Sequence, residues 1–484
     1  MAGLDPRNST GNTKITEDKA APSSIDAFNI ISNETGKFVD ISGGITEFKY
    51  YESIMQNTVR ISVTYADSGV IRGKPDPTNG KSVIEGLPLV GSEKCVIKFK
   101  DNNKITIGDK PKLNLFVNKV IPMFSDTRKS LVTLELVSKE FFMNEKGCTR
   151  VVRRHDGKIS DTVNKIFKDN LKTDKDYKDN IETTENNFNF IPNNKKPMYL
   201  LDWLSKKSVP EGKRGKSAGF FFWETYKGFH YRSIDWLLDK EKNKPKISII
   251  FNDTGDDNGK DVPAGYQVKA IRYDKGNLID VQNKFKMGFQ STRIILFNPF
   301  DGYYCVTPTQ VETDDRPSDT GDSTTGKSVN EIETAGKKLP KMNEELRCTA
   351  PGKDFTRTTY YIKDTGTLNS GDTTEEQLKK SKEENFDFRL IENQAIQRYN
   401  QLYSSSTTIT IPATFLLHAG DTVFIDDASL QVNTKNDEVD KEHGGLYLIS
   451  DLIHYLDNTG TWTKINVVRD SFGRKGNAAA VGGN

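Results

Sequence analysis

Hydrophobic and polar residues alternate along much of the first third of the chain. In the stretch NTVRISVTYADSG, residues 57–69, every second position from Val59 to Tyr65 is apolar, and the stretch ends in turn-forming residues. A period of two residues is typical of a β-strand that buries one face. Short segments of this kind recur between turns, with few helical signals. The pattern therefore predicts an antiparallel β-barrel or sandwich over residues 25–145.

The apolar period lengthens after residue 145. The stretch SDTVNKIFKDNL, residues 160–171, places its apolar residues on one helical face. PMYLLDWLSKKS, residues 197–208, begins with a proline that suits a first helical turn. GFFFWETYKGFHYRSI, residues 219–234, predicts a β-hairpin whose large aromatic side chains point to both faces, as in a strand buried between two layers. We expect a small α+β domain over residues 146–245.

Strand-like segments resume at residue 246 and predict a second antiparallel β-barrel over residues 246–308 and 374–475. Residues 309–373, which would interrupt this barrel, are acidic, rich in Thr, Ser and Gly, and poor in apolar residues, so we expect an extended polar arm. Residues 1–24 are expected to form a disordered N-terminal arm and residues 476–484 a flexible tail. The predicted fold class is mainly β, with two antiparallel β-barrels and an α+β insertion.

One cluster of residues resembles a catalytic site. The stretch GLYLISDLIHYLDNTGTW, residues 445–462, holds Ser450, Asp451 and His454 within five positions. Side chains alternate between the two faces of a strand, which places Ser450 and His454 on one face and Asp451 on the other. Asp451 then cannot orient the histidine as a Ser-His-Asp triad requires. We therefore interpret the stretch as a β-hairpin that is covered on both faces.

Two further patterns resemble ligand-binding loops. Residues 321–328 satisfy GxxxxGK[ST], the P-loop signature, but an acidic, proline-broken segment precedes them instead of a buried strand and would repel a nucleotide. Residues 251–261, FNDTGDDNGKD, resemble a calcium loop, but Lys260 stands where an oxygen ligand belongs. The five histidines show neither HxH nor HExxH spacing, and the four cysteines form no CxxC pair. We expect no catalytic residue, no metal and no cofactor.

The composition restricts the possible partners. Charged residues make up 28% of the chain, yet the formal net charge is only +2, which argues against a dedicated nucleic-acid-binding protein. No run of about 18 apolar residues occurs, so we expect no membrane insertion. The N-terminal residues lack the apolar core of a signal peptide. A mean hydropathy of −0.63 fits a soluble chain with long polar loops.

Several stretches, taken in order, resemble one family: the central baseplate hub subunit of contractile-tailed bacteriophages. This family is related in fold to the N-terminal hub of type VI secretion spike proteins. The resemblance covers most of residues 25–475 and is carried by ISGGITEFKYYESI (41–54), ISVTYADSG (61–69), LVTLELVSKEFFMNEKG (131–147), TRVVRRHDGKISDTVNKIF (149–167), FIPNNKKPMYLLDWLSKKS (190–208), GFFFWETYKGFHYRSI (219–234), HAGDTVFID (418–426), GGLYLISDLIHYL (444–456) and TKINVVRDSFG (463–473).

The resemblance implies a structural role. Both β-domains would be tail-tube-like barrels, and a homotrimer would form a ring of six barrels between the hexameric tail tube and the trimeric central spike. DNA would pass through its channel. Implied partners are the spike, tube or tube-initiator proteins, the tape-measure protein and surrounding baseplate proteins, in a virion assembled in the host bacterial cytoplasm. Candidate packing or interface residues are Tyr51, Glu52, Phe222, Trp223, Asp421, Tyr447, Tyr455 and Trp462.

Two other functions stay open at the level of sequence. A tail-associated cell-wall hydrolase would need two accessible carboxylates in a cleft or a zinc site, and the sequence offers neither pattern. A host-receptor adhesin would also suit β-domains with long polar loops. Zymography would detect the first, and inhibition of phage adsorption by the isolated protein would detect the second.

Overall fold

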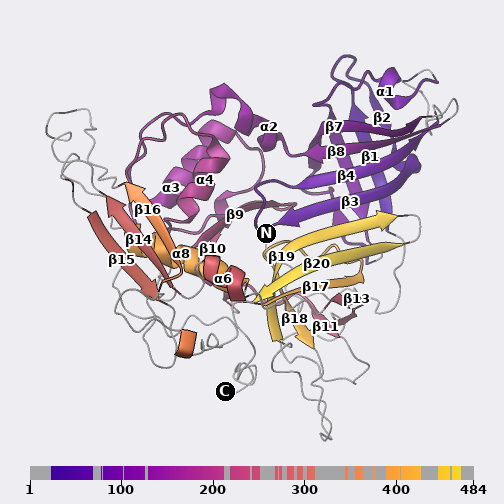
Figure 1. Ribbon diagram of the computed structural model, residues 1–484. Coiled ribbons are helices and arrows are strands. Elements are labelled where there is room, and N and C mark those ends of the chain that lie inside the picture. Colours follow the sequence, from indigo (N-terminus) through magenta and orange to yellow (C-terminus); the bar gives the residue numbers. More distant parts are fainter. Residues whose placement is uncertain are drawn as a thin grey trace, which may run out of the picture.

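The computed structural model describes most of the predicted β-regions and the small domain between them. The described residues are 23–68, 78, 80–101, 103–125, 129–211, 218–239, 242–250, 267–270, 272–274, 281–287, 291–297, 302, 304–310, 344–346, 355–362, 373, 375, 388–403, 405–426, 445–457 and 460–469. Among them, one 15-stranded sheet dominates, beside a two-stranded and a three-stranded sheet (Figure 1). The predicted mainly β fold is confirmed.

Some predicted features lie outside the described residues. These are the P-loop-like residues 321–328, the calcium-loop-like residues 251–261, most of the N-terminal arm and the C-terminal tail.

The first β-unit is a curved antiparallel sheet. Its strands are β1 (Ser24–Ile31), β2 (Phe38–Asp40), β3 (Ile45–Ser53), β4 (Arg60–Asp67), β5 (Lys94–Lys100), β6 (Thr106–Ile107), β7 (Leu113–Ser125) and β8 (Ser130–Val137), with the short helix α1 (Val83–Gly86) after β4. The strand order is β2-β1-β5-β7-β8-β4-β3, and β6 pairs with β5. The 3-10 turn η1 (Ser42–Gly44) contacts both β1 and β4 and brings the two ends of this sheet together. Every second side chain of β5 points into the core, where Cys95, Ile97 and Phe99 are all fully buried.

The second β-unit closes into a barrel. Its strands are β11 (Ser248–Ile250), β12 (Gln267–Lys269), β13 (Arg272–Asp274), β17 (Ser405–Pro412), β18 (Thr422–Asp426), β19 (Gly445–Asp457) and β20 (Thr461–Arg469). They follow the order β12-β11-β18-β19-β20-β17-β13. Because only two residues separate β12 from β13, these short strands act as successive parts of one strand, and the ladder returns to its start.

The second barrel is not wholly antiparallel, in contrast to the prediction. β11 pairs in parallel with both β12 and β18. Parallel neighbours require a connection of a dozen or more residues, and residues 251–266 provide one between β11 and β12. Alternation within a strand reports which face is buried and carries no information on the direction of the partner strand.

The two β-units are joined in one continuous sheet by β19. Along one edge β19 pairs with β20; along the other it pairs first with β18 and then, from Asp451 to Asp457, with β3 of the first unit. The interiors also merge into one hydrophobic core. At the joint, the rings of Phe99 and Phe415 lie 5.0 Å apart in edge-to-face contact, and His454 lies 4.6 Å from Phe415.

A β-bulge in β19 overturns the predicted alternation of this strand. The register shifts between Ile449 and Asp451, so Ser450 is an extra residue in the ladder. Before the bulge the odd positions Tyr447 and Ile449 enter the main core; after it the even positions, such as Leu452, do. Ser450 therefore does not share a face with His454, and its hydroxyl donates to the Asp451 carboxylate at 2.8 Å, contrary to the prediction.

The small domain packs between the β-units and the third sheet (Figure 1). Its elements are α2 (Lys139–Glu145), η2 (Gly147–Thr149), α3 (Ile159–Lys165), the π-helix η3 (Ile166–Leu171), η4 (Lys178–Asn180), α4 (Pro197–Ser205), β9 (Phe220–Thr225), β10 (Gly228–Ser233) and α5 (Ile234–Leu238). Every residue of β9 is buried. Phe222 packs in the domain's own core and Trp223 in a second core shared with the second barrel, as the hairpin pattern predicted.

A third sheet lies at the far end of the molecule from β2 and α1 (Figure 1). It consists of β14 (Ser291–Phe297) between β15 (Tyr304–Gln310) and β16 (Arg357–Ile362), with α6 (Val281–Met287), η6 (Glu344–Leu346) and α8 (Phe388–Leu402) as the accompanying helical elements. β14 and most of β15 come from residues 246–308, which we expected to lie in the second barrel, and β16 comes from the predicted polar arm. A local pattern predicts that a strand forms and does not identify the sheet it joins.

We predict that the merged core makes the two β-units unfold together. Replacing Phe99 with alanine removes a ring at the joint and should cost about 3–5 kcal/mol of unfolding free energy. Urea unfolding, followed by circular dichroism and tryptophan fluorescence, should show one transition shifted to lower urea. The exposed Phe38→Ala control should change stability by less than about 0.5 kcal/mol. Two separate transitions would contradict the shared core.

Candidate functional site

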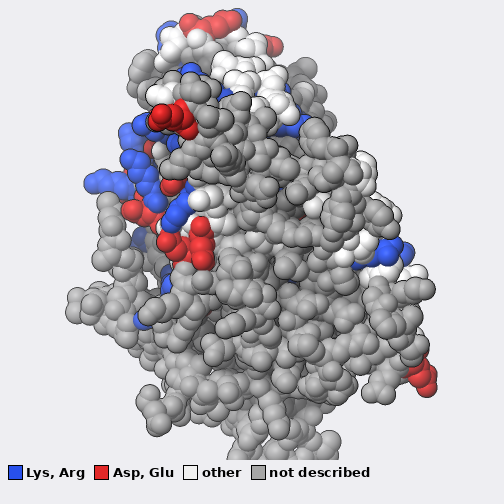
Figure 2. Space-filling model, turned by 90° about the vertical axis from the view of Figure 1, so that its left-hand side faces the viewer, with Lys and Arg blue, Asp and Glu red and all other residues white. Residues whose placement is uncertain are grey.

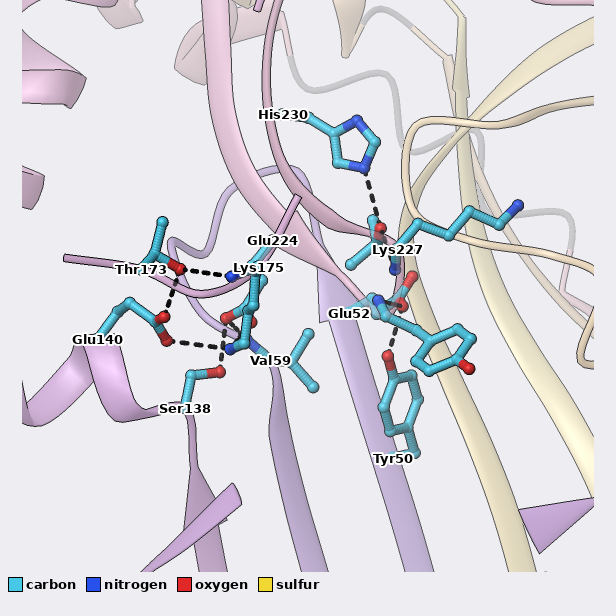
Figure 3. A network of polar contacts seen from close by, with 12 residues as sticks. Tyr50, Glu52, Val59, Ser138, Glu140, Thr173, Lys175, Glu224, Lys227 and His230 are labelled. Carbon is cyan, nitrogen blue, oxygen red and sulfur yellow. Dashed lines mark hydrogen bonds and ion pairs between the residues drawn. The ribbon is translucent and has the colours of Figure 1, made fainter. Parts of the chain in front are cut away.

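Glu52 of β3 is a buried carboxylate where three distant parts of the chain meet. Figure 3 shows it beside Tyr50 and the β9–β10 turn. Within the first unit it accepts a hydrogen bond from the Tyr50 hydroxyl at 2.5 Å. From the β9–β10 turn of the small domain it accepts the Tyr226 backbone N–H at 2.9 Å. From the loop before β18 it accepts the Ala419 N–H at 2.9 Å, and its oxygens lie 3.2 and 3.3 Å from His418 Nδ1. One side chain therefore ties three modules together.

The electrostatics of Glu52 favour its charged form. Burial alone would raise the pKa of this carboxyl group, because a charge is poorly solvated inside a protein. The neighbouring His418 ring and the hydrogen bonds from His418, Tyr50 and Tyr226 outweigh burial and lower the pKa to about 2. Glu52 thus remains an anion that needs all of its donors in place.

A second buried carboxylate, Glu224 of β9, attaches the small domain to the first unit (Figure 3). It accepts the Val59 N–H at 3.0 Å from the β3–β4 turn and the Ser138 hydroxyl at 2.6 Å from the end of β8. Lys175 forms ion pairs with both Glu224 and Glu140 of α2. Burial raises the pKa of Glu224, Lys175 opposes this, and Glu140 adds to it. The cluster joins residues of the first unit to the helical and hairpin parts of the small domain.

Trp223 of β9 packs against the outside of the second barrel at a glycine. Its indole N–H donates to the Ala419 carbonyl at 3.0 Å. The next residue, Gly420, has a φ of +90°, which favours glycine, and a Cβ there would lie 2.7 Å from the Trp223 ring. The loop HAGD, residues 418–421, therefore donates a hydrogen bond to Glu52 and accepts one from Trp223. Its glycine also leaves space for the Trp223 ring.

Helix α8 is joined to the small domain by two ion pairs. Lys207 forms a buried ion pair with Glu392 of this helix, and its ammonium lies 4.8 Å from the centroid of the Trp203 ring. Arg398 of α8 pairs with Asp235 at the start of α5. A buried ion pair costs desolvation energy, and losing one partner leaves an isolated charge, so each pair demands one specific arrangement of the two elements.

The structure brings together three of the eight candidate residues, Glu52, Trp223 and Asp421. Glu52 and Trp223 contact the HAGD loop, residues 418–421, and Asp421 belongs to that loop, where its Oδ2 accepts the His418 N–H at 3.0 Å. Phe222 precedes Trp223 in β9, but its side chain packs in the core of the small domain. Tyr51, which neighbours Glu52 in β3, is half-buried and points to the opposite face. Tyr447 is buried, with the Arg469 guanidinium 4.5 Å from the centroid of its ring.

Tyr455 and Trp462 form a separate pair on the outer side of the second unit. They lie opposite each other in the β19–β20 ladder, half-buried, with ring centroids 6.0 Å apart. The Tyr455 hydroxyl donates to Glu47 of β3 at 3.1 Å. The pair therefore covers the seam between the two β-units rather than the interior of a barrel.

We call the contacts of Glu52 and Glu224 between the small domain and the two β-units the junction. Sequence reasoning missed several of its residues. Glu140, Lys175, Glu224, His418 and Gly420 were not among the candidates. The available signal was a single glutamate within an otherwise apolar strand, as in FFFWET, because a buried charge requires partners. Those partners come from remote segments, so no local pattern identifies them.

The Ser450, Asp451 and His454 side chains do not form the hydrogen-bonded arrangement of a Ser-His-Asp triad. His454 Nδ1 is paired with the Thr463 hydroxyl at 2.9 Å, and Asp451 is hydrogen-bonded to Ser53, Ser450 and Asn466. Within the part of the chain that the structure describes, no three His, Cys, Asp or Glu side chains are grouped so that they could hold a metal ion. No helix among the described residues is long and apolar enough to cross a membrane.

Three solved structures give the relevant similarities. The 43 kDa tail protein of prophage MuSo2 from Shewanella oneidensis has 10% identity and a TM-score of 0.46, covering 92% of this chain and 100% of that protein. A tail protein from Neisseria meningitidis MC58 has 10% identity and a TM-score of 0.48, covering 93% and 98%. The E. coli c3393 protein, a component of the type VI secretion system, has 7% identity and a TM-score of 0.37, covering 94% and 79%.

The chain resembles phage tail proteins. By sequence, it matches no family model and no curated protein. Identities of 10% or less and TM-scores below 0.5 assign no role to any residue. Three of the stretches that carry the sequence resemblance, residues 41–54, 219–234 and 418–426, meet at Glu52.

We predict that Glu52→Ala destabilises the whole fold by about 3–5 kcal/mol, because it leaves buried donors from three modules without an acceptor. Urea unfolding at neutral pH would measure the loss. Glu145→Ala, which removes an exposed carboxylate paired with exposed Lys196, is the control and should cost less than about 1 kcal/mol. A similar cost for both variants would contradict the role of Glu52.

The same carboxylate predicts an acid dependence. Its pKa is lower in the folded chain, about 2, than the ordinary value of 4.5, so the unfolded chain takes up the proton first as pH falls. The stabilisation from Glu52 is complete above about pH 4.5 and is lost as pH falls towards 2. Unfolding midpoints measured across this window should decline less in Glu52→Gln than in the wild type. Parallel profiles would contradict the assignment.

We predict that Gly420→Ala displaces Trp223. The added methyl group would collide with the indole ring and also force alanine into a backbone conformation that favours glycine. The near-ultraviolet circular dichroism of tryptophan should change and the unfolding midpoint should fall. Gly36→Ala is the matched control: Gly36 also has a positive φ, +68°, but nothing lies within 4 Å of the point that a Cβ would occupy there. Equal effects of the two variants would exclude the steric explanation.

Proposed function

We propose that this chain is a non-enzymatic hub subunit of the baseplate of a contractile phage tail. Three copies form a ring of six barrel units, which joins the hexameric tail tube to the trimeric central spike and surrounds the channel through which DNA passes. The partners are the spike, tube or tube-initiator proteins, the tape-measure protein and surrounding baseplate proteins. The protein acts in the virion after assembly in the host cytoplasm.

The β3–β19 ladder carries this proposal. It fuses two β-units into one sheet, so each chain contributes two adjacent units in a fixed relative orientation. Threefold association of such a chain provides six units, which matches a sixfold tube on one side and a threefold spike on the other. Two units linked by a loose segment could not maintain that match, because each could rotate separately.

The buried polar contacts between the modules support a role in transmitting force. Glu52 and Glu224 connect the small domain to both β-units, and α8 clamps its other side through Lys207–Glu392 and Arg398–Asp235. These are buried contacts between modules, and none of them leaves an accessible pair of groups that could act on a substrate. A rigid connector between two other assemblies needs this kind of internal bracing.

The charge distribution fits passage of DNA without tight binding. The net charge of the chain is +2, and on the side of the molecule shown in Figure 2 the described basic and acidic side chains are intermixed. A protein that grips DNA gathers Lys and Arg on one surface and neutralises many phosphates. A hub that allows DNA to slide has no such requirement.

We predict that the purified protein assembles into a three-chain ring. Light scattering should give three times the chain mass of 54.5 kDa, and negative-stain images should show a central opening. A single-chain mass at assembly concentrations, or a compact particle with no opening, would contradict the hub. Clearing in zymography or inhibition of phage adsorption would instead favour a hydrolase or an adhesin.

A further inference from the structure

The two β-units repeat one arrangement of four strands. In the first unit β4, β5, β7 and β8 follow each other along the chain, apart from the short β6, and lie across the sheet in the order β4-β8-β7-β5. In the second unit β17, β18, β19 and β20 follow each other and lie in the order β17-β20-β19-β18. The long strands β7 and β19 both have 13 residues, and the first four of each pair with β5 or with β18. The two units therefore share one four-stranded module.

The two long strands also change register at the same place. The extra residue is Ser450 in β19 and Asn118 in β7, where the shift falls between Val117 and Lys119. Val117 and Ile449, which precede the bulges, both lie in the main core. Beyond the bulge β19 pairs with β3, whereas β7 has no strand on that side in the part of the chain that the structure describes. Unpaired backbone groups along such an edge are a template for pairing with another strand.

The second barrel contains the counterpart of β3. In the first unit, a row of Cα partners starts directly after the bulge of β7 and crosses to β3 through Lys119, Glu135, Ser62 and Lys49. In the second unit, the row that starts directly after the bulge of β19 crosses to β13 through Asp451, Asn466, Thr408 and Asp274. β13 thus has the place in the second unit that β3 has in the first. The outer edge of β3 is covered by β19 (Figure 1), while β13 pairs with β17 alone among the described strands.

Side chains on the free half of β7 are exposed where those of β19 are covered. Leu452 and His454 follow the bulge of β19 and are 1% and 0% exposed. The first unit covers them, and the His454 ring stacks on Tyr50 of β3 with centroids 5.8 Å apart. At the same positions of β7, Val120 is half-buried and Pro122 is exposed. One chain therefore leaves open in its first unit the surface that its internal joint covers in the second.

Phe124, near the turn, is the counterpart of Tyr455. β7 has a second register shift between Pro122 and Phe124, which β19 lacks. Allowing for that extra residue, the Phe124–Leu131 pair stands where the Tyr455–Trp462 pair stands. Phe124 is 62% exposed, whereas Tyr455 is half-buried beside β3. Because Pro122 has no N–H and the second shift bends the edge, a partner strand forms a shorter ladder here than β3 forms with β19.

We propose that β7 of one copy pairs with β13 of the next copy, so that the β19–β3 ladder within a chain is repeated between chains. The internal ladder joins the second unit of a chain to its first, and the proposed ladder joins that first unit to the second unit of a neighbour. Each unit then provides one long strand and one β3-like edge, and three chains close a ring whose six units are joined in one way. The occupant is a second copy because this chain itself contains the strand that fits the edge in direction and register. The inference rests on the proposed threefold ring and names the strands that hold it together.

The internal ladder predicts the register of the proposed one. Tyr455 lies opposite Lys49 in the β19–β3 ladder. Phe124 has the place of Tyr455, and Asp274 has the place of Lys49, so position 124 should lie opposite position 274 of the next copy. Cβ atoms at opposite positions of an antiparallel ladder are about 4.5–5.5 Å apart. A charge or a thiol introduced at these two positions therefore reports the contact.

Charge changes at the two positions test the ladder. Phe124→Asp places two aspartates opposite each other and should raise the chain concentration at which rings dissociate by about tenfold or more, because like charges repel across a ladder. Adding Asp274→Lys should restore the ring, and circular dichroism should be unchanged in both variants. Val152→Asp is the control: it alters an apolar residue of the small domain that is 58% exposed and should leave the three-chain mass unchanged. Loss of the ring that Asp274→Lys leaves uncorrected would overturn the inference.

Cysteine cross-linking tests the register without adding a charge. In a Cys148→Ser background, co-expressed Phe124→Cys and Asp274→Cys chains should be joined in pairs by a disulfide between positions 124 and 274, identified as a linked peptide by mass spectrometry. Neither variant alone should give that peptide. A three-chain ring that withstands Phe124→Asp, with no linked peptide, would overturn this inference and leave the hub intact. A wild type that stays at one chain would overturn both.

Discussion

One strand, β19, belongs to both β-units, and the arrangement of the rest of the molecule depends on it. Its bulge at Ser450 rotates the strand, so that different positions face the core on the two sides of the bulge. The same point marks the change of neighbour from β18 to β3. At the point where β19 changes partner, Asp451 accepts hydrogen bonds from Ser53, Ser450 and Asn466 and so stabilises both neighbouring strands. The two β-units are thereby joined into one body.

The small domain is attached to this body by buried charge rather than by apolar contact alone. An apolar interface tolerates sliding, because one hydrocarbon contact is nearly equivalent to the next. Glu52 and Glu224 each require several donors at defined positions, and those donors come from different modules. Desolvating the carboxylates costs stability, but a misplaced module would leave them unpaired, which costs more. The buried carboxylates therefore lower the stability of the fold somewhat but fix one position of the small domain on the two β-units.

Alternation and helical periodicity predicted the strands of the first unit, the helices of the small domain and the doubly buried hairpin at residues 219–234. They failed where one residue changes the register, as at Ser450, since a bulge leaves no mark in an apolar run. They also failed for β14, β15 and β16, whose pattern is compatible with any half-buried sheet. For the junction, Glu52 and Trp223 were recognisable as unusual residues in strands, whereas Lys175 and Gly420 act through remote partners that only the tertiary structure brings close.

The shared strand also affects the order in which the chain can fold. β3 is synthesised early, but the strand that covers its outer edge comes almost 400 positions later, as the separation of 398 between Ser53 and Asp451 shows. During translation the first unit must therefore wait with an uncovered, strongly β-forming edge. Such an edge can capture another nascent chain, and contacts so distant in sequence are slow to form. The outer edge of β3 therefore stays open to other strands until residues 451–457 have been synthesised.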